Sequence, residues 1–387
     1  MKRALRNLYS ALKARGKQNV DKQVIRLSPA IIPKGHVLLS YIIESFLIDP
    51  DHPTFRSHTH YWETRQIVNI FLELGYAVDL ISYRNTSFRP ERNYDFFVSA
   101  RTNFDRLAAR LNDACVKVAH LDTAHWITNN YNAYGRLFNL VQRRNVALTG
   151  SIRLIEHNSA IENADLATVL GNTFTMESYT YANKPIYRIP ISSPIEYGWQ
   201  KRDINAIRHN YLWFGSAGFV HKGLDLVLEL FAGLPDYQLF VCGPLHKEKA
   251  FVQEFHCELL ETENIHPVGW VDINGAKFKE MLNQCLGIIY PSCAEGGGGS
   301  VIDCMRAGVI PVVSYEASVD VNGNGVTLKD CSLPEMHKAV TRVSDLPSSE
   351  LEDMARETWQ SASSTHSKAS FAQKYKEFVL NVLLQSD

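Results

Sequence analysis

Residues 290–314 combine two acids with four consecutive glycines at a predicted turn from a strand to a helix. Glu295 stands before the glycines, Ser300 follows them, and Asp303 lies inside the predicted helix. Glycines at such a turn let a ligand approach the bare backbone, and the free N–H groups that begin a helix favour an anion. Carboxylates on both sides of the turn can bind hydroxyl groups. The segment therefore predicts a ligand whose phosphates lie between two sets of hydroxyls, as in a sugar nucleotide.

The same segment resembles the E-x7-E signature of retaining glycosyltransferases, family four (glycosyl transferases group one) in particular, with Asp303 in place of the second Glu. Three further motifs of that family precede it in the expected order, FGSAGFVHKGLDLVLE, YQLFVCGP and HPVGWVD. The likeness covers roughly 150 residues, and four ordered motifs are far more specific than one. It implies the GT-B fold, retention of the anomeric configuration and a reaction that needs no bound metal or other cofactor.

Short apolar strands alternate with helices on both sides of a proline-containing break at residues 190–210. This alternation predicts parallel sheets built from right-handed crossovers. A chain of 387 residues also exceeds what one core usually supports. We therefore predict an α/β protein with two Rossmann-like doubly wound domains facing a cleft. Its parts are a basic segment (1–35), an acceptor-side domain (36–193), a linker (194–208), a donor-binding domain (209–364) and a C-terminal helix (365–387) that packs back toward the first domain.

Lys222 lies just before a predicted helix, where a cation is poorly placed for the helix dipole. A diphosphate between Lys222 and the glycine-rich turn would explain its position, and a solvated surface lysine is the alternative. The family often has an arginine a few residues earlier, but here the loop reads Ser-Ala-Gly218. Leaving-group stabilisation therefore depends on Lys222 and backbone amides, or on an arginine from elsewhere, for example Arg143, Arg144 or Arg188.

The resemblance assigns further roles in the second domain. Glu295 is expected to bind hydroxyls of the transferred sugar and to act in catalysis with Lys222. Asp303 is expected to bind the nucleotide ribose, although an acid in the first turn of a helix is also favoured without a ligand. The other predicted donor-binding residues are Gly218, Gly297, Gly298, Gly299 and Ser300.

Two histidines follow the predicted strand VKVA in the first domain. The family often has a histidine at the end of this strand, near the reacting centre of the sugar. His120 fits that position better by strand register, with His125 as the second choice and a hydrogen-bonded structural role as the alternative. Asp122 and Asn130 lie nearby as candidate ligands for hydroxyls.

The loop FRSHTHYWE lacks the glycine pair that many family members carry after the first strand. Its aromatic and basic side chains instead suggest an acceptor-binding loop, because aromatic faces stack on sugars and arginine pairs with anions. The predicted acceptor-side residues are Arg56, His58, His60, Trp62 and His125. His58 and His60 could also bind a metal, but no third ligand has diagnostic spacing, so we expect no metal site.

Bulk properties indicate a globular enzyme of the cytoplasm. The formal net charge is -1, which argues against a broad nucleic-acid groove. Seven scattered cysteines without a CxxC pair are typical of reduced core thiols. No apolar run reaches the ~18 residues of a spanning helix. Residues 1–34 are strongly basic, with leucines 5, 8 and 12 at helical spacing. They predict either a solvated tail or helix, which we favour, or an amphipathic helix that contacts the inner face of the membrane peripherally.

These features predict a retaining glycosyltransferase that moves a sugar from a nucleoside-diphosphate sugar to a glycan, lipid-linked or small-molecule acceptor. A sugar-nucleotide 2-epimerase of the same fold and a non-catalytic nucleotide-sugar-binding protein are the main alternatives. An NAD-dependent oxidoreductase shares only the layered architecture, and the GSAGFVHKG loop lacks GxGxxG spacing. The nucleotide base, the sugar and the acceptor are not specified by any residue pattern.

Overall fold

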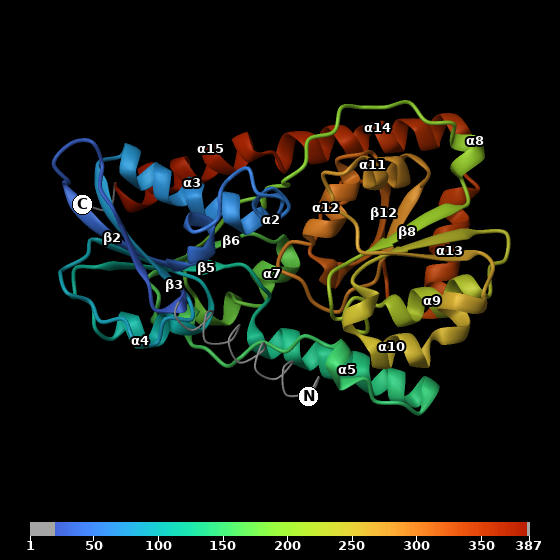
Figure 1. Ribbon diagram of the computed structural model, residues 1–387, viewed down its shortest axis with the longest axis horizontal. Coiled ribbons are helices and arrows are strands. Elements are labelled where there is room, and N and C mark those ends of the chain that lie inside the picture. The colour runs from blue at the N-terminus through green and yellow to red at the C-terminus, as the bar shows by residue number, and fades with distance from the viewer. Residues whose placement is uncertain (1–19, 385–387) are drawn as a thin grey trace, which may run out of the picture.

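The computed structural model describes residues 20–384, and their strands form two sheets that lie side by side in Figure 1. The strands of the first sheet are β1 (Val24–Leu27), β2 (Gly35–Tyr41), β3 (Tyr76–Ser82), β4 (Phe96–Ser99), β5 (Val116–Leu121), β6 (Leu166–Val169) and β7 (Ile186–Arg188). Those of the second are β8 (Asn210–Phe214), β9 (Gln238–Cys242), β10 (Ile265–Gly269), β11 (Gly287–Tyr290), β12 (Ile310–Ser314) and β13 (Val326–Leu328).

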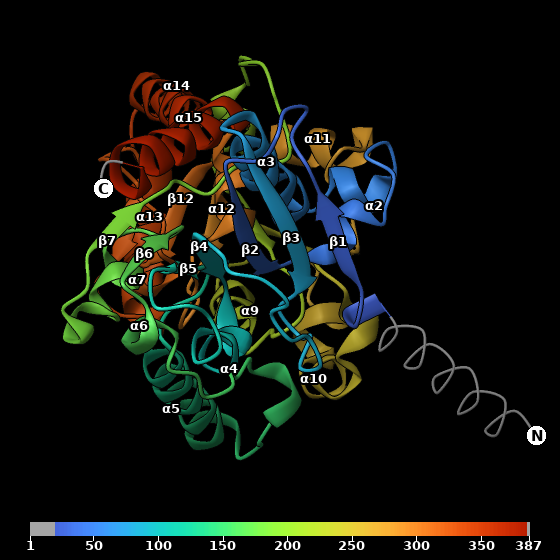
Figure 2. The same ribbon diagram turned by 90° about the vertical axis from the view of Figure 1, so that its left-hand side faces the viewer.

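Both sheets have the crossed strand order of doubly wound domains. The first follows β1-β3-β2-β4-β5-β6-β7 and the second β10-β9-β8-β11-β12-β13. Neighbouring strands are parallel except at β1, which pairs antiparallel with β3 at the edge of the sheet, as Figure 2 shows. Crossed order brings ligand sites to the carboxyl ends of the strands, so the loops after β4, β5, β8 and β11 are the ones that matter for function.

Helices cover the sheets and connect their strands. They are α2 (Pro53–Arg56), α3 (Thr59–Glu73), α4 (Phe104–Ala108), α5 (Trp126–Arg144), α6 (Ala160–Asn163), α7 (Thr173–Glu177), α8 (Ile204–Ile207), α9 (Leu224–Ala232), α10 (Lys249–Glu254), α11 (Ala276–Asn283), α12 (Gly299–Met305), α13 (Leu333–Ser344), α14 (Ser348–Thr365) and α15 (Lys368–Phe378). A short 3₁₀ turn, η3 (Thr149–Ser151), follows α5.

Local sequence explains how α3 is formed and where it ends. Ile67, Val68, Ile70 and Phe71 are buried, which is the spacing of one helical face. The helix ends next to Gly75, whose φ of +89° lies in the left-handed region that a residue with a side chain rarely adopts. β3 follows at once, so α3 completes a β-α-β crossover that packs over the first sheet.

The C-terminal helices connect the two domains a second time, in addition to the linker between β7 and β8. In Figure 1, α14 lies over the second domain and α15 continues along the first. Phe371 of α15 packs edge-on against Trp62 of α3, with their ring centroids 5.9 Å apart. The edge strands β1, β7 and β13 were not predicted from the sequence, because each is short and not strongly apolar.

The basic amphipathic helix predicted near the N-terminus lies outside the described residues. Within residues 20–384, no helix is both long and apolar enough to cross a membrane.

Candidate functional site

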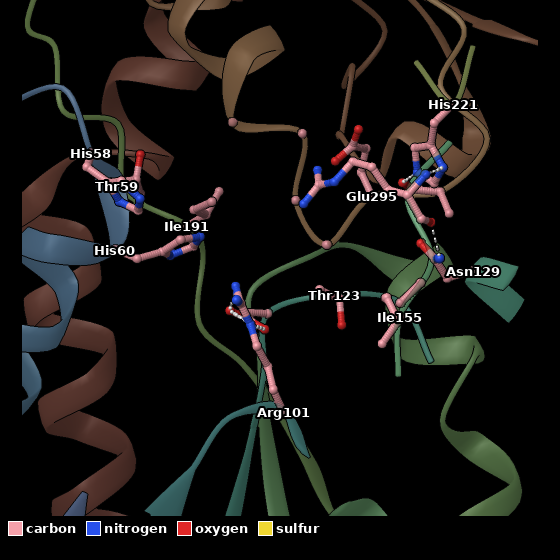
Figure 3. Close-up of a pocket in the computed structure, with 18 of the residues that line it drawn as sticks. His58, Thr59, His60, Arg101, Thr123, Asn129, Ile155, Ile191, His221 and Glu295 are labelled. Carbon is pink, nitrogen blue, oxygen red and sulfur yellow. Dashed lines mark hydrogen bonds and ion pairs between the residues drawn. The ribbon is translucent and has the colours of Figure 1, made fainter. Parts of the chain in front are cut away.

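A cavity of about 310 Å³ lies between the two domains and is called the central cavity here. The glycine-rich turn and Glu295 of the second domain line one side, and residues 57–60, Arg101 and Asp122 of the first domain line the other. Figure 3 shows Glu295 and His221 facing His58, Thr59 and His60 across this space, with Arg101 between the two groups. The predicted interdomain site is therefore a real cavity with polar walls.

Two further cavities adjoin the central one and share residues with it. The C-terminal cavity, about 270 Å³, extends along the second domain past Lys222, Ser300 and Asp303. The N-terminal cavity, about 320 Å³, extends into the first domain past Arg84 and His120. The three cavities together offer space for a two-part ligand that spans both domains.

Lys222 and Glu295 form a buried ion pair at the junction of the central and C-terminal cavities. Lys222 Nζ lies 2.5 Å from Glu295 Oε1 and donates also to the hydroxyl of Tyr290, at 2.9 Å. The same carboxylate oxygen accepts hydrogen bonds from Tyr290 at 2.9 Å and from Ser292 at 3.0 Å. Only 4% of the Lys222 side chain and 12% of the Glu295 side chain are exposed. Lys222 is thus no solvated surface lysine.

Nearby cations hold the carboxylate of Glu295 in its ionised form. Burial alone would raise the pKa of Glu295, but the nearby cations Lys222 and Arg153 lower that pKa to about 2. Burial lowers the pKa of Lys222, and the carboxylate of Glu295 opposes that effect. A fixed pair of opposite charges therefore stands at the entrance of the C-terminal cavity.

The four glycines serve two different purposes. A side chain on Gly296 would clash with the backbone of the first domain, since a Cβ there would lie 2.2 Å from the carbonyl oxygen of Asp122. Gly298 has a φ of +51° and is enclosed by Ala317 and Val319. A Cβ on Gly297 would lie 3.4 Å from Ile191 Cγ2, and one on Gly299 would lie 3.8 Å from Ile191 Cδ1, which are ordinary contact distances. All four glycines line the central cavity, and at Gly296 and Gly298 the missing side chain also makes room for neighbouring parts of the protein.

Asp303 lies on α12 and lines the C-terminal cavity. Its carboxylate accepts a hydrogen bond from Ser193 Oγ at 2.7 Å, and burial raises its pKa to about 7. Trp270, which is 65% exposed, Val271 and Ile273 line the same cavity with apolar surface. Sequence reasoning missed Trp270, although it stands within the HPVGWVD motif. The cavity offers a carboxylate for hydroxyls and an aromatic face for a planar group.

His120 and His125 occupy different environments. His120 is buried in β5, where its Nδ1 lies 2.8 Å from Thr168 Oγ1 and its Nε2 has no partner among the described residues. It lines the N-terminal cavity, and burial lowers its pKa to about 4. His125 caps α5 by accepting from the Ile127 amide, and its Nε2 lies 2.9 Å from the Tyr181 hydroxyl. The structure therefore gives His125 a structural role outside the central cavity.

The predicted acceptor loop divides between the cavity and the surface. His58 and His60 line the central cavity; burial lowers the pKa of His58 to about 4, and His60 Nδ1 lies 2.8 Å from the buried Glu63. Arg56 instead pairs with Asp51 at the surface, 2.5 Å away. Trp62 packs against α15. The acceptor-side role predicted for Arg56 and Trp62 finds no support in their positions, because neither lines the central cavity.

Sequence reasoning also missed Arg101, which follows β4 and lies beside Asp122 at the end of β5. Arg101 has a left-handed backbone with a φ of +67°, which is a strained conformation for a residue with a side chain. Its guanidinium lies 2.7 Å from the carboxylate of Asp122. Burial would raise the pKa of that carboxyl, but Arg101 lowers the pKa to about 2. Asp122, a candidate hydroxyl ligand from the sequence, lines the central cavity and is paired with an arginine that no motif indicated.

The arginines proposed to assist Lys222 are engaged elsewhere. Arg143 and Arg144 join α5 to the second domain through ion pairs with Asp225, Glu229 and Glu258. Arg188 pairs with Asp320. Arg153, which sequence reasoning did not single out, lines all three cavities.

Within residues 20–384, no group of three or more His, Cys, Asp or Glu side chains is placed to hold a metal ion. His58 and His60 stand near each other, with ring centroids 5.9 Å apart, without a third such residue.

The family model described as "Glycosyl transferases group 1" matches residues 200–358, which include Lys222, Glu295 and Asp303. No curated protein matches the chain.

Solved structures similar to this chain are glycosyltransferases of low sequence identity. HepE of Anabaena, in complex with UDP and glucose, is 12% identical with a TM-score of 0.55, covering 90% of this chain and 99% of HepE. Sucrose-phosphate synthase from Thermosynechococcus elongatus is 13% identical with a TM-score of 0.59, covering 91% of this chain and all of the synthase. S. aureus TarM, 13% identical with a TM-score of 0.50, matches 75% of this chain, which spans only 55% of TarM. These likenesses confirm the predicted GT-B fold.

Proposed function

We propose that this chain, a GT-B protein whose second domain is that of the Glycosyl transferases group 1 family, transfers a sugar from a nucleoside-diphosphate sugar with retention of the anomeric configuration. The observation that carries the proposal is the buried Lys222–Glu295 pair, which stands where the central and C-terminal cavities meet. The nucleotide would occupy the C-terminal cavity and the acceptor the central cavity.

One carboxylate oxygen of Glu295 is hydrogen-bonded within the protein, and the other is free to bind a ligand. Oε1 takes part in three hydrogen bonds, from Lys222, Tyr290 and Ser292, whereas Oε2 accepts none from the described residues. A carboxylate fixed on one side in this way presents its second oxygen in a constant direction. We assign Oε2 to hydroxyls of the transferred sugar, in agreement with the role that the family resemblance implies.

The difficult step is the departure of the nucleotide from the anomeric carbon, through an oxocarbenium-like state. Negative charge then grows on the diphosphate, and a preorganised cation in a water-poor site stabilises it by several kcal/mol. Lys222 is such a cation, because burial and its hydrogen bonds fix its ammonium group. Gly297 and Gly299 line the central cavity, and their backbone amides are suited to contact the same phosphates.

Asp303 and Trp270 complete the proposed nucleotide site. An ionised Asp303 can accept hydrogen bonds from two neighbouring ribose hydroxyls, and the exposed face of Trp270 can stack on a base. Because Anabaena HepE was solved with UDP and glucose, UDP-sugars are the first donors to test.

No side chain is assigned as a general base. His58 and His120 both line cavities, but burial lowers the pKa of each to about 4, so each is a weak base at neutral pH. We propose that the leaving phosphate accepts the proton of the acceptor hydroxyl, on the same face of the sugar ring. The reaction then retains configuration and needs no metal ion.

The proposal is tested by incubating the purified protein with UDP-glucose or UDP-N-acetylglucosamine and a panel of glycan, lipid-linked and small-molecule acceptors. We expect release of UDP that depends on acceptor, and an anomeric linkage of the same configuration as in the donor by NMR. Loss of turnover in Lys222→Ala and Glu295→Ala, with folding intact, would support the assigned roles. Full activity in both variants would overturn the proposal.

A further inference from the structure

Arg153 lies in the first domain but faces the second domain's part of the site. It follows the 3₁₀ turn η3 and lines the central, C-terminal and N-terminal cavities alike. Its side chain is exposed, and its guanidinium makes no hydrogen bond or ion pair with any other residue between positions 20 and 384. The positively charged guanidinium of Arg153, with its five N–H donors, therefore faces the space where the three cavities meet.

The backbone around Arg153 is held firmly by the first domain. Its carbonyl accepts a hydrogen bond from Asn129 Nδ2 at 2.9 Å. Two residues later, Ile155 exchanges two hydrogen bonds with the side chain of Asn130, both at 2.9 Å. Two asparagines on one turn of α5 therefore fix a segment that has no regular secondary structure. Such positioning lowers the entropy lost when the side chain binds a ligand.

The same segment is joined to the second domain beside Lys222. The amide of His221 donates to the Ser151 carbonyl at 3.0 Å, and the amide of Arg153 donates to His221 Nδ1 at 3.4 Å. Gly218 lies directly under the arginine, since a Cβ there would be only 2.8 Å from Arg153 Cγ. The predicted donor-binding glycine therefore makes room for an arginine from the other domain.

Charge balance shows what Arg153 is available to bind. The C-terminal cavity is lined by two cations, Lys222 and Arg153, and by two acids, Glu295 and Asp303. Lys222 is already neutralised by Glu295. Across the central cavity, Arg101 is likewise neutralised by Asp122. Among the described residues, Arg153 is the one cation lining either cavity that forms no ion pair with an acid, although its charge helps Lys222 to lower the pKa of Glu295. A diphosphate needs more positive charge than a neutralised lysine supplies.

We infer that Arg153 binds the diphosphate of the donor from the first domain, opposite Lys222, and so acts in place of the arginine that the loop 215–218 lacks. This inference rests on the proposed function, because it assumes a nucleoside-diphosphate ligand. It adds that the phosphates are bound by both domains at once. The donor then bridges the two domains.

The inference is tested by calorimetry with UDP, GDP and ADP, followed by the monophosphate and the nucleoside of whichever base binds best, at one fixed ionic strength. We expect Arg153→Ala to weaken diphosphate binding roughly 10- to 100-fold, the usual cost of losing a charge-assisted hydrogen bond. Nucleoside binding should not change. Arg153→Lys should recover part of the loss, since it keeps the charge but not the fork.

Arg356→Ala is the matched control, because Arg356 is an exposed arginine of α14 that pairs only with the neighbouring Asp353. It should bind every nucleotide as the wild type does. Equal diphosphate affinity in Arg153→Ala and wild type would overturn the inference while leaving the proposed function intact. Equal losses for diphosphate and nucleoside would show a merely structural role and also overturn it. A folded wild-type protein that binds no diphosphate would overturn the proposed function, and the inference with it.

Discussion

The ammonium of Lys222 and the carboxylate of Glu295 lie 2.5 Å apart although 73 positions separate them in the chain. They belong to two of the four motifs that gave the sequence its resemblance to glycosyltransferases, the HKG loop after β8 and the glycine-rich turn after β11. β8 and β11 are neighbours in the second sheet, so parallel pairing brings their carboxyl ends, and with them the two motifs, together.

Breaking this pair should affect stability and activity separately. Lys222→Ala leaves a buried carboxylate without a partner, and we expect it to lower the free energy of unfolding by about 3–5 kcal/mol. Replacing both charges, as Lys222→Met with Glu295→Gln, should restore much of that stability. Transfer activity should fall at least about 100-fold in each variant, because the charge that stabilises the leaving group is gone. Urea unfolding and a transfer assay measure the two effects; an active double variant would contradict the assigned roles.

Asp303 should make the stability of the protein depend on pH. Its folded pKa is raised to about 7 by burial, above its unfolded value near 3.8. The folded state therefore binds the proton of Asp303 more tightly than the unfolded state does. The stabilisation that this proton gives the folded state is complete below about pH 3.8 and is lost as the pH rises through 7. The free energy of unfolding of Asp303→Asn, minus that of the wild type, should therefore increase by up to about 4 kcal/mol between pH 4 and pH 8. Urea unfolding at both pH values measures it, and a constant difference would contradict the predicted ionisation.

The same group should make donor affinity depend on pH in the opposite direction. Only the ionised carboxylate accepts hydrogen bonds at both oxygens, so affinity for an intact nucleoside-diphosphate sugar should rise roughly 10-fold from pH 6 to 8. His58, His120 and His221 all have pKa values lowered to about 4, so their titration does not interfere. Calorimetry with UDP-glucose measures the effect. Asp303→Asn is the control and should show no such rise.

The second-domain residues singled out in the sequence lie close together in the structure, and their signals are local. The acids, the glycines and Lys222 all stand in short loops directly after apolar strands, and the parallel fold then brings those loops together. Edge strands such as β1 were missed since they are short and lie beside polar or basic residues.

First-domain residues were harder to predict because their direction depends on helical rotation and on contact between domains. In the loop at residues 55–63, His58 and His60 reach the cavity, whereas Trp62, further along the start of α3, turns toward α15. The residue types alone could not show which of these side chains reach the cavity and which pack against α15. Arg153 had no signal at all, because the segment around it lacks periodicity and its place is fixed by asparagines of α5 and by the other domain.

Removal of metal ions should leave donor binding unchanged. The proposed contacts to the phosphates come from Lys222, Arg153 and backbone amides, which need no bridging cation. A thermal-shift panel of UDP, GDP, ADP, TDP and CMP, with and without EDTA, should give one selective rise in the unfolding midpoint that EDTA does not reduce. A shift that disappears in EDTA and returns with Mg²⁺ or Mn²⁺ would contradict the metal-free mechanism.

Gly296 should be intolerant of a side chain for a reason unrelated to ligand binding. A Cβ at this position would lie 2.2 Å from the carbonyl oxygen of Asp122 and 2.6 Å from Thr123 Cα, and backbone atoms cannot move aside as a flexible side chain can. Gly296→Ala should therefore push the turn away from the first domain, lower stability by roughly 1–3 kcal/mol and reduce transfer activity. Gly135→Ala in α5 is the matched control, since nothing lies within 4 Å of its Cβ position. That change should keep activity and raise stability by up to about 1 kcal/mol. Thermal unfolding and the transfer assay decide the matter: equal behaviour of the two variants would show that the turn and the first domain are not in contact in solution.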